Sequence, residues 1–178
     1  RSARKVSSFY RITYIWHGYC KLYLTDPQTG GDQKPIMLQK GDFCYMPPGI
    51  WYYTETPEGL ENTNIYFYYT TSATPPEAIP APERESLQQG SGETPPLCPL
   101  FQFSDIPMLS GVFCLHDTFG GAGRMRQILQ EWTARYRYAD EMLNQMTAEL
   151  LLRMVRQKDF QARSGSREAA DRAIAYIG

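Results

Sequence analysis

The sequence predicts a mainly β protein with a C-terminal α part, in which a small β-barrel is followed by an antiparallel pair of helices. Three observations lead to this fold class. Runs rich in β-branched and aromatic residues, separated by turn sequences, fill the first two thirds of the chain. A Gly-Asp turn at Gly41 and a Pro-Pro-Gly stop at Pro47 flank one of these runs. From Ala122 onward, apolar residues recur at helical spacing instead.

Residues 8–24 predict two strands that are joined at His17-Gly18. Because successive side chains of a strand point to opposite faces, Arg11, Thr13 and Ile15 share one face of the first strand. Aromatic and aliphatic residues occupy the other face. One side of this strand is therefore polar enough to line a cavity.

A hairpin corner follows these strands. A strand over 34–38 enters the corner, Gly41 supplies a positive φ, and the Asp42 side chain can hydrogen-bond within the turn. Pro47 lacks an N–H donor, so strand pairing ends there. An aromatic cluster at 51–53 then begins the next strand.

The strand expected at 62–70 carries two asparagines on one face. Its alternation places Asn62, Asn64 and Tyr66 together, opposite an apolar set. Asparagine is depleted in strands and needs hydrogen-bond partners when it is buried. This face therefore points either to solvent or to a ligand, and the sequence leaves both alternatives open.

The chain between 72 and 99 is rich in Pro, Glu, Gln and Gly, which predicts a long surface loop rather than regular structure. Two short strands are expected after it, at 100–103 and 111–115. We therefore assign residues 1–118 to the barrel, with a Pro-rich insert at 72–99.

Residues 119–160 predict two amphipathic helices, the second running from an N-cap at Asp140 to about residue 158. The full apolar stripe of this second helix is too wide for one partner helix. We therefore expect part of it to form a homodimer contact, and the alternative is plain packing on the barrel. The predicted dimer residues recur at spacings of three and four: Leu143, Met146, Leu150 and Met154.

A polar linker is expected at 161–166, and Ser166 is expected to cap a further helix over 167–177. The chain starts without Met and ends inside this helical pattern. We therefore expect a piece of a longer protein, whose next domain begins within 161–178.

Composition excludes several classes of function. The formal net charge of −1 does not provide the broad positive field of a nucleic-acid-binding domain. No stretch reaches the ~18 consecutive apolar residues of a membrane span, which predicts a soluble, cytoplasmic protein with no membrane partner. The four Cys stand far apart in apolar or Pro-rich runs, so free thiols are favoured over disulfides.

The sequence gives little support to catalytic chemistry. A metal centre needs about three converging His or carboxylate ligands, and the chain has only two His, His17 and His116, on distant segments. The sequence contains no nucleophile elbow, phosphate-binding loop or dinucleotide fingerprint. We therefore expect no enzyme activity, no metal and no cofactor.

Binding of a small polar molecule is the remaining function. The barrel interior is expected to present a guanidinium, amides, hydroxyls and aromatic faces, which together suit a sugar or an organic acid. A one-residue shift in register would replace the cavity-facing residue at 52 by its neighbours. The candidate ligand-binding residues come from three strands: Arg11, Thr13, Tyr52, Thr54, Asn62, Asn64 and Tyr66.

The order of these parts resembles the effector-binding and dimerisation half of an AraC-type transcriptional regulator. The resemblance rests on the Gly41-Asp42 turn, the Pro-Pro-Gly stop, two amphipathic helices, a polar linker and an Ala-Ile-x-Tyr-Ile ending at Ile177. It implies a cupin-like (jelly-roll) barrel that binds a small effector such as a sugar, and a helix pair that forms a homodimer. It also implies that DNA is contacted only through a C-terminal helix-turn-helix domain, of which this chain holds the start.

The resemblance further implies ligand contacts from the strand after Pro-Pro-Gly, from the strand with Asn62 and Asn64, and from an N-terminal arginine, Arg1 or Arg4. The His that is common after Pro-Pro-Gly in the family is replaced here by aromatic residues. Two other functions stay open. One is a cupin-type enzyme, such as an isomerase or a dioxygenase, and the other is an interaction module whose barrel is filled by its own aromatic residues.

Overall fold

The computed structural model describes residues 4–26, 29–56, 59–71, 100–103 and 106–177. The loop predicted at 72–99 lies outside these residues. A 3₁₀ helix at Pro107–Ser110 precedes the last strand. The strands and α-helices, in chain order, are β1 (Lys5–Val6), β2 (Tyr10–His17), β3 (Tyr19–Leu24), β4 (Ile36–Gln39), β5 (Asp42–Met46), β6 (Trp51–Glu55), β7 (Glu61–Thr71), β8 (Leu100–Phe103), β9 (Phe113–His116), α1 (Gly121–Ala134) and α2 (Ala139–Ile177).

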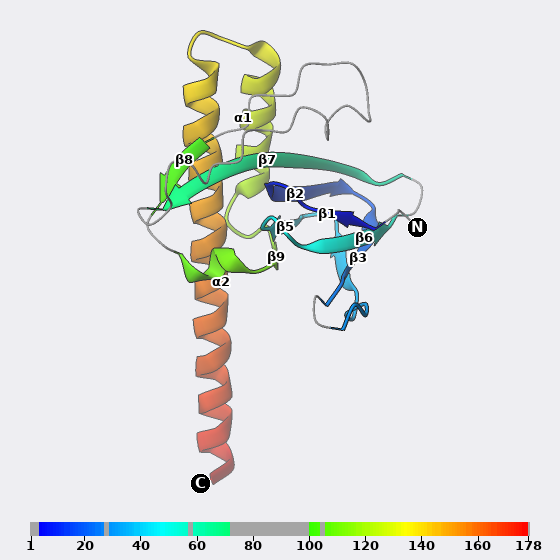
Figure 1. The fold of residues 1–178 in the computed structure, drawn as a ribbon. Coiled ribbons are helices and arrows are strands. Elements are labelled where there is room, and N and C mark those ends of the chain that lie inside the picture. The colour runs from blue at the N-terminus through cyan, green and yellow to red at the C-terminus, as the bar shows by residue number, and fades with distance from the viewer. Residues whose placement is uncertain (1–3, 27–28, 57–58, 72–99, 104–105, 178) are drawn as a thin grey trace.

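The described strands form two sheets, and a pair of helices packs beside them (Figure 1). One sheet has the order β1-β6-β3-β4, with antiparallel pairs. The other has the order β8-β7-β2-β5-β9, in which β8 adds a parallel edge to an antiparallel set. This architecture confirms the predicted fold class, a cupin-like sandwich followed by an antiparallel helix pair. Neither helix of the described chain is apolar enough over a sufficient length to cross a membrane.

β2 is the central strand of the larger sheet, and its two faces contact different parts of the molecule. It pairs with β5 on one side and with β7 on the other. Ile12 and Tyr14 are buried in a core that also contains Met125 of α1 and residues of α2. Arg11 and Thr13 lie on the opposite face, toward the smaller sheet. The alternation in the sequence predicts this division.

The corner between β4 and β5 has the geometry that its turn residues predict. Gly41 has φ +89°, and the Asp42 carboxylate accepts a hydrogen bond from the backbone N–H of Gln39 at 2.9 Å. Asp42 also contacts Nδ1 of His116 at 2.8 Å, which connects the corner to the end of β9. β5 ends at Met46, directly before the two prolines.

Asp117 hydrogen-bonds the start of α1, although it lies four residues before the first helical residue. Its carboxylate accepts hydrogen bonds from the backbone N–H groups of Phe119, Gly121 and Ala122, at 3.2, 2.8 and 2.7 Å. These N–H groups have no partner within the helix, so the carboxylate satisfies them and also favours the positive end of the helix dipole.

Helix α2 differs from its prediction at both ends. It begins at Ala139, so Asp140 lies in the first turn and is not the cap. It then continues to Ile177 through 161–166, where a linker was predicted, and projects beyond the sheets (Figure 1). Extending a formed helix costs only the propensity of each added residue, about 1 kcal/mol for Gly165, so this polar sequence does not end it.

The four residues predicted to form a dimer contact are buried inside this chain. They are at most 7% exposed and belong to a core shared by the larger sheet and both helices: Leu143, Met146, Leu150 and Met154. The helix is covered by α1, β8 and β9 together. The sequence shows the width of the apolar stripe, but it does not show that several elements of the same chain cover it. In the structure these four side chains therefore pack inside their own chain, which corresponds to the alternative of packing on the barrel.

This placement predicts that Met154→Ala lowers the free energy of unfolding of the single chain by about 2–5 kcal/mol, because it leaves a cavity at a fully buried position. Met142→Ala is the matched control, since Met142 is 47% exposed on the same helix, and its effect should stay within about 0.5 kcal/mol. Urea unfolding at low protein concentration measures both. Equal effects of the two substitutions would contradict the intramolecular core.

Candidate functional site

A cavity of about 190 Å³ lies between the two sheets. It is lined by residues from β1 to β7, and the larger sheet and the smaller sheet supply opposite walls. Every residue that the sequence predicts to bind a ligand is among the lining residues: Arg11, Thr13, Tyr52, Thr54, Asn62, Asn64 and Tyr66. The structure thus brings the predicted residues together, and their contact with a ligand stays a prediction.

Strand register explains the wall on the larger sheet. Arg11 is paired with Tyr66 across β2 and β7, and Thr13 is paired with Asn64. Paired residues lie on the same face of a sheet, so the two strands present adjacent polar rows. Asn62 is two residues from Asn64 along β7 and continues this face.

The opposite wall depends on the parity of β6. Tyr52 and Thr54 line the cavity, and Thr54 is paired with Leu22 of β3. Tyr53 points the other way, where its ring stacks on Tyr23 with 4.5 Å between ring centroids and is 3% exposed. The register that the sequence left undecided therefore places Tyr52, and not its neighbours, at the cavity.

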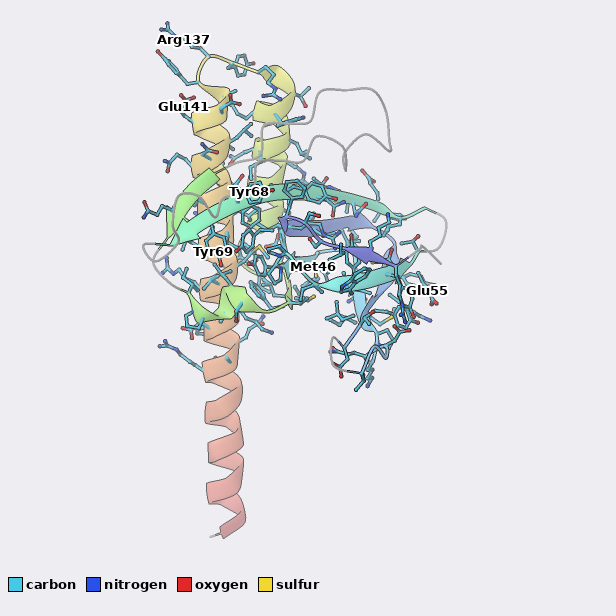
Figure 2. All side chains as sticks on the ribbon, in the orientation of Figure 1. Met46, Glu55, Tyr68, Tyr69, Arg137 and Glu141 are labelled. Atoms are coloured by element: carbon cyan, nitrogen blue, oxygen red, sulfur yellow. The ribbon has the colours of Figure 1, made fainter. Side chains whose placement is uncertain are left out.

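Arg11 is the buried cation of this cavity. It is 9% exposed, and its Nη1 donates a hydrogen bond to the Tyr52 hydroxyl at 2.6 Å. Its Nη2 lies 3.4 Å from the thioether sulfur of Met46, in the interior of the molecule (Figure 2). Its Nε is buried and has no hydrogen-bond acceptor among the described residues. None of the ion pairs among the described residues includes Arg11.

A second polar contact orients the neighbouring row. The Thr13 hydroxyl donates to the Asn64 side-chain oxygen at 2.6 Å. The Asn64 side chain also carries an NH₂ group, and Arg11 and Asn62 supply further hydrogen-bond donors to the same wall.

Several lining residues are not predicted from the sequence. Lys5 belongs to β1, a two-residue strand that was not predicted, and it is paired with Tyr52 of β6. Cys44 meets the cavity because it is paired with Thr13. Such positions depend on which strands are neighbours, and the sequence carries no local signal for that. The other missed lining residues are Cys20, Leu22, Leu38, Thr56 and Leu60.

The thiols at the cavity are uncharged at neutral pH. Burial raises the pKa of Cys20, and a hydrogen bond with Cys114 together with burial raises the pKa of Cys44. The free cysteines are Cys20, Cys44 and Cys114, as the sequence predicts. Cys98 lies outside the described residues. These thiols therefore do not balance the charge of Arg11.

The remaining candidates lie elsewhere. Arg4, one of two arginines that the family resemblance suggests, forms an ion pair with Asp32 at 2.8 Å and is not a lining residue. Arg1 lies outside the described residues. The part of the chain that the structure describes contains no group of three or more His, Cys, Asp or Glu side chains placed to hold a metal ion.

The fold defines a class of protein, a cupin-like β-sandwich that encloses a cavity between its sheets and carries a helix pair. Residues 1–131 match the family model of the AraC-like ligand binding domain. The match covers most of the chain, including every cavity-lining strand and α1 as far as Glu131, so the chain belongs to this family. A search of the curated proteins finds none that matches it. The family match confirms the resemblance that the order of the sequence elements indicates.

The guanidinium of Arg11, which has no ionic partner among the described residues, leads to a prediction about the ligand-free protein. Arg11→Met should raise the free energy of unfolding by about 1 kcal/mol, because burying a charge without an ionic partner costs more than burying a thioether of similar length. Thermal unfolding without added ligand measures this change. Arg137→Met is the control, because Arg137 is exposed at the α1–α2 turn, far from the cavity (Figure 2). A loss of about 1 kcal/mol instead would assign Arg11 a structural role.

Proposed function

We propose that this chain is the effector-sensing and dimerisation part of a transcriptional regulator. It binds a small polar molecule, sugar-like or an organic acid, between its two sheets, and DNA is contacted by a separate C-terminal domain. One observation supports this most strongly: in a chain of the AraC-like ligand binding family, three strands direct guanidinium, amide, hydroxyl and phenol groups into one cavity. A ligand that completes their hydrogen bonds removes the cost of burying them incompletely paired.

The position of β2 suggests how occupancy of the cavity reaches α2. Arg11 and Thr13 contact the cavity side, while Ile12 and Tyr14 on the same strand pack in the core that contains α2. A ligand that favours one arrangement of the cavity rows therefore favours one packing of the helix. It shifts the equilibrium only by the difference in its affinity for the two arrangements.

The first test is a thermal-shift screen of neutral sugars and small organic acids. A ligand at about 100 times its dissociation constant stabilises the folded chain by about 2.7 kcal/mol, which raises the melting temperature by several degrees. Asn64→Ala and Tyr52→Ala should each lose this shift, because they remove an amide and an aromatic wall of the cavity.

The control for these variants is Tyr19→Ala, since Tyr19 is 48% exposed on β3 and does not line the cavity. It should keep the full shift of the unmodified chain. The proposal fails if no compound of either class stabilises the protein, or if all three variants respond alike.

We also propose that dimerisation uses an outer face of α2, since the four residues predicted from the sequence are buried. Leu152 and Phe160 are 39% and 65% exposed. They are separated by two steps of four residues, so they lie on one side of the helix. Together with Arg156 and Phe119 they line a surface groove. A second copy of the chain packed on this groove would cover both apolar side chains.

Sedimentation velocity at micromolar concentration tests this second contact. The unmodified chain should sediment as a dimer, and the double substitution Leu152→Arg with Phe160→Glu should give a monomer, because it replaces both exposed apolar side chains of a groove whose other lining residues are mostly charged. Tyr136→Glu, at an exposed aromatic residue beyond the end of α1, should leave the dimer intact. A monomer for the unmodified chain would contradict the proposed dimer.

A further inference from the structure

The charged side chains that line the cavity, within the described part of the chain, are all of one sign. Among the described residues that line it, Lys5 and Arg11 are cations, and no lining residue is an Asp or a Glu. Lys5 is exposed at the rim, whereas Arg11 is buried within the wall. The two cysteines of the wall are neutral because their thiol pKa values are raised. The cavity therefore carries a positive charge that its own lining residues do not balance.

Among the described residues, the guanidinium of Arg11 contacts only neutral groups. It bonds to the phenol oxygen of Tyr52, lies 4.5 Å from the centroid of the Tyr52 ring and contacts the thioether of Met46, while Nε lacks an acceptor among these residues. A guanidinium presents a planar fork of donors that matches a carboxylate, and hydrogen bonds between two charged groups are roughly twice as strong as neutral ones. A neutral ligand would leave this buried charge without a counter-ion.

The rest of the wall indicates what else the ligand carries. Asn64 offers an NH₂ donor beside Arg11, and Asn62 and Thr54 add an amide and a hydroxyl. These groups suit hydroxyl oxygens. The volume of about 190 Å³ equals that of about six water molecules at roughly 30 Å³ each, which restricts the ligand to the size of a small metabolite.

We propose that the effector is a small hydroxylated carboxylate, in which the carboxylate is bound by Arg11 and the hydroxyl groups contact Asn62 and Asn64. This inference rests on the proposed effector-binding function and adds the charge of the ligand to it. Lys5 at the rim contributes to attraction of the anion at low ionic strength and is not a required contact, since it is exposed and screened by salt.

Matched probes that differ mainly in charge test this inference. Isothermal titration and thermal shift compare glucuronate with glucose, galacturonate with galactose, and lactate with lactamide. At least one acid should bind at millimolar concentration or below, while its neutral counterpart should bind more weakly by about tenfold or more. Arg11→Met should weaken binding of the acid by about thirtyfold or more. Arg11→Lys should recover part of that affinity, because lysine keeps the charge but lacks the planar fork of donors.

The control Arg137→Met removes the same charge far from the cavity and should bind the acid as the unmodified chain does (Figure 2). Equal binding of an acid and its neutral counterpart, or acid binding that survives in both Arg11 variants, would overturn the anionic effector. A neutral sugar whose binding is lost in Asn64→Ala but kept in Arg11→Met would also overturn the anionic effector. This result would not contradict the effector-binding function. If neither the acids nor the neutral probes bind, both proposals fail.

Discussion

The alternation of side chains along β2 is the constraint on which the rest of this structure depends. The strand is paired on both sides, so its register cannot change without breaking two ladders, and a shift by one residue would exchange its faces. Ile12 and Tyr14 hold the helices against the larger sheet, and Arg11 and Thr13 face the cavity. The hydrophobic core and the candidate site are therefore two faces of one strand.

Buried polar groups occur in both the core and the cavity, but only the cavity wall buries a charged side chain among the described residues. In the core, the Tyr45 hydroxyl donates to the backbone oxygen of Leu109 at 2.8 Å, and the indole N–H of Trp16 donates to Thr63 at 2.8 Å. These two groups are satisfied, as buried polar atoms normally are, whereas the hydroxyl of the fully buried Thr147 on α2 has no hydrogen-bond partner among the described residues. In the cavity, Arg11 has neutral partners and a buried Nε without an acceptor among the described residues. The large aromatic core supplies stability that offsets this incomplete pairing.

Helix α2 connects the core to the distal end of the molecule. Its first half is buried by the larger sheet and α1, while its second half projects from them (Figure 1). The same helix therefore contributes to folding and extends to Ile177. A rearrangement of the core would be carried along it as a rigid-body movement.

Local patterns in the sequence determined the strands other than β1, the Gly41 corner and the polar face of the predicted cavity strands, because turn chemistry and a period of two act over a few residues. They also pointed to the residues from Arg11 to Tyr66 that now surround one cavity. Only the tertiary structure decided which strands are neighbours, and so brought Lys5 and Cys44 to that cavity. It likewise decided what covers α2: burial depends on every element packed against a helix, whereas the sequence of the helix shows only its own apolar stripe.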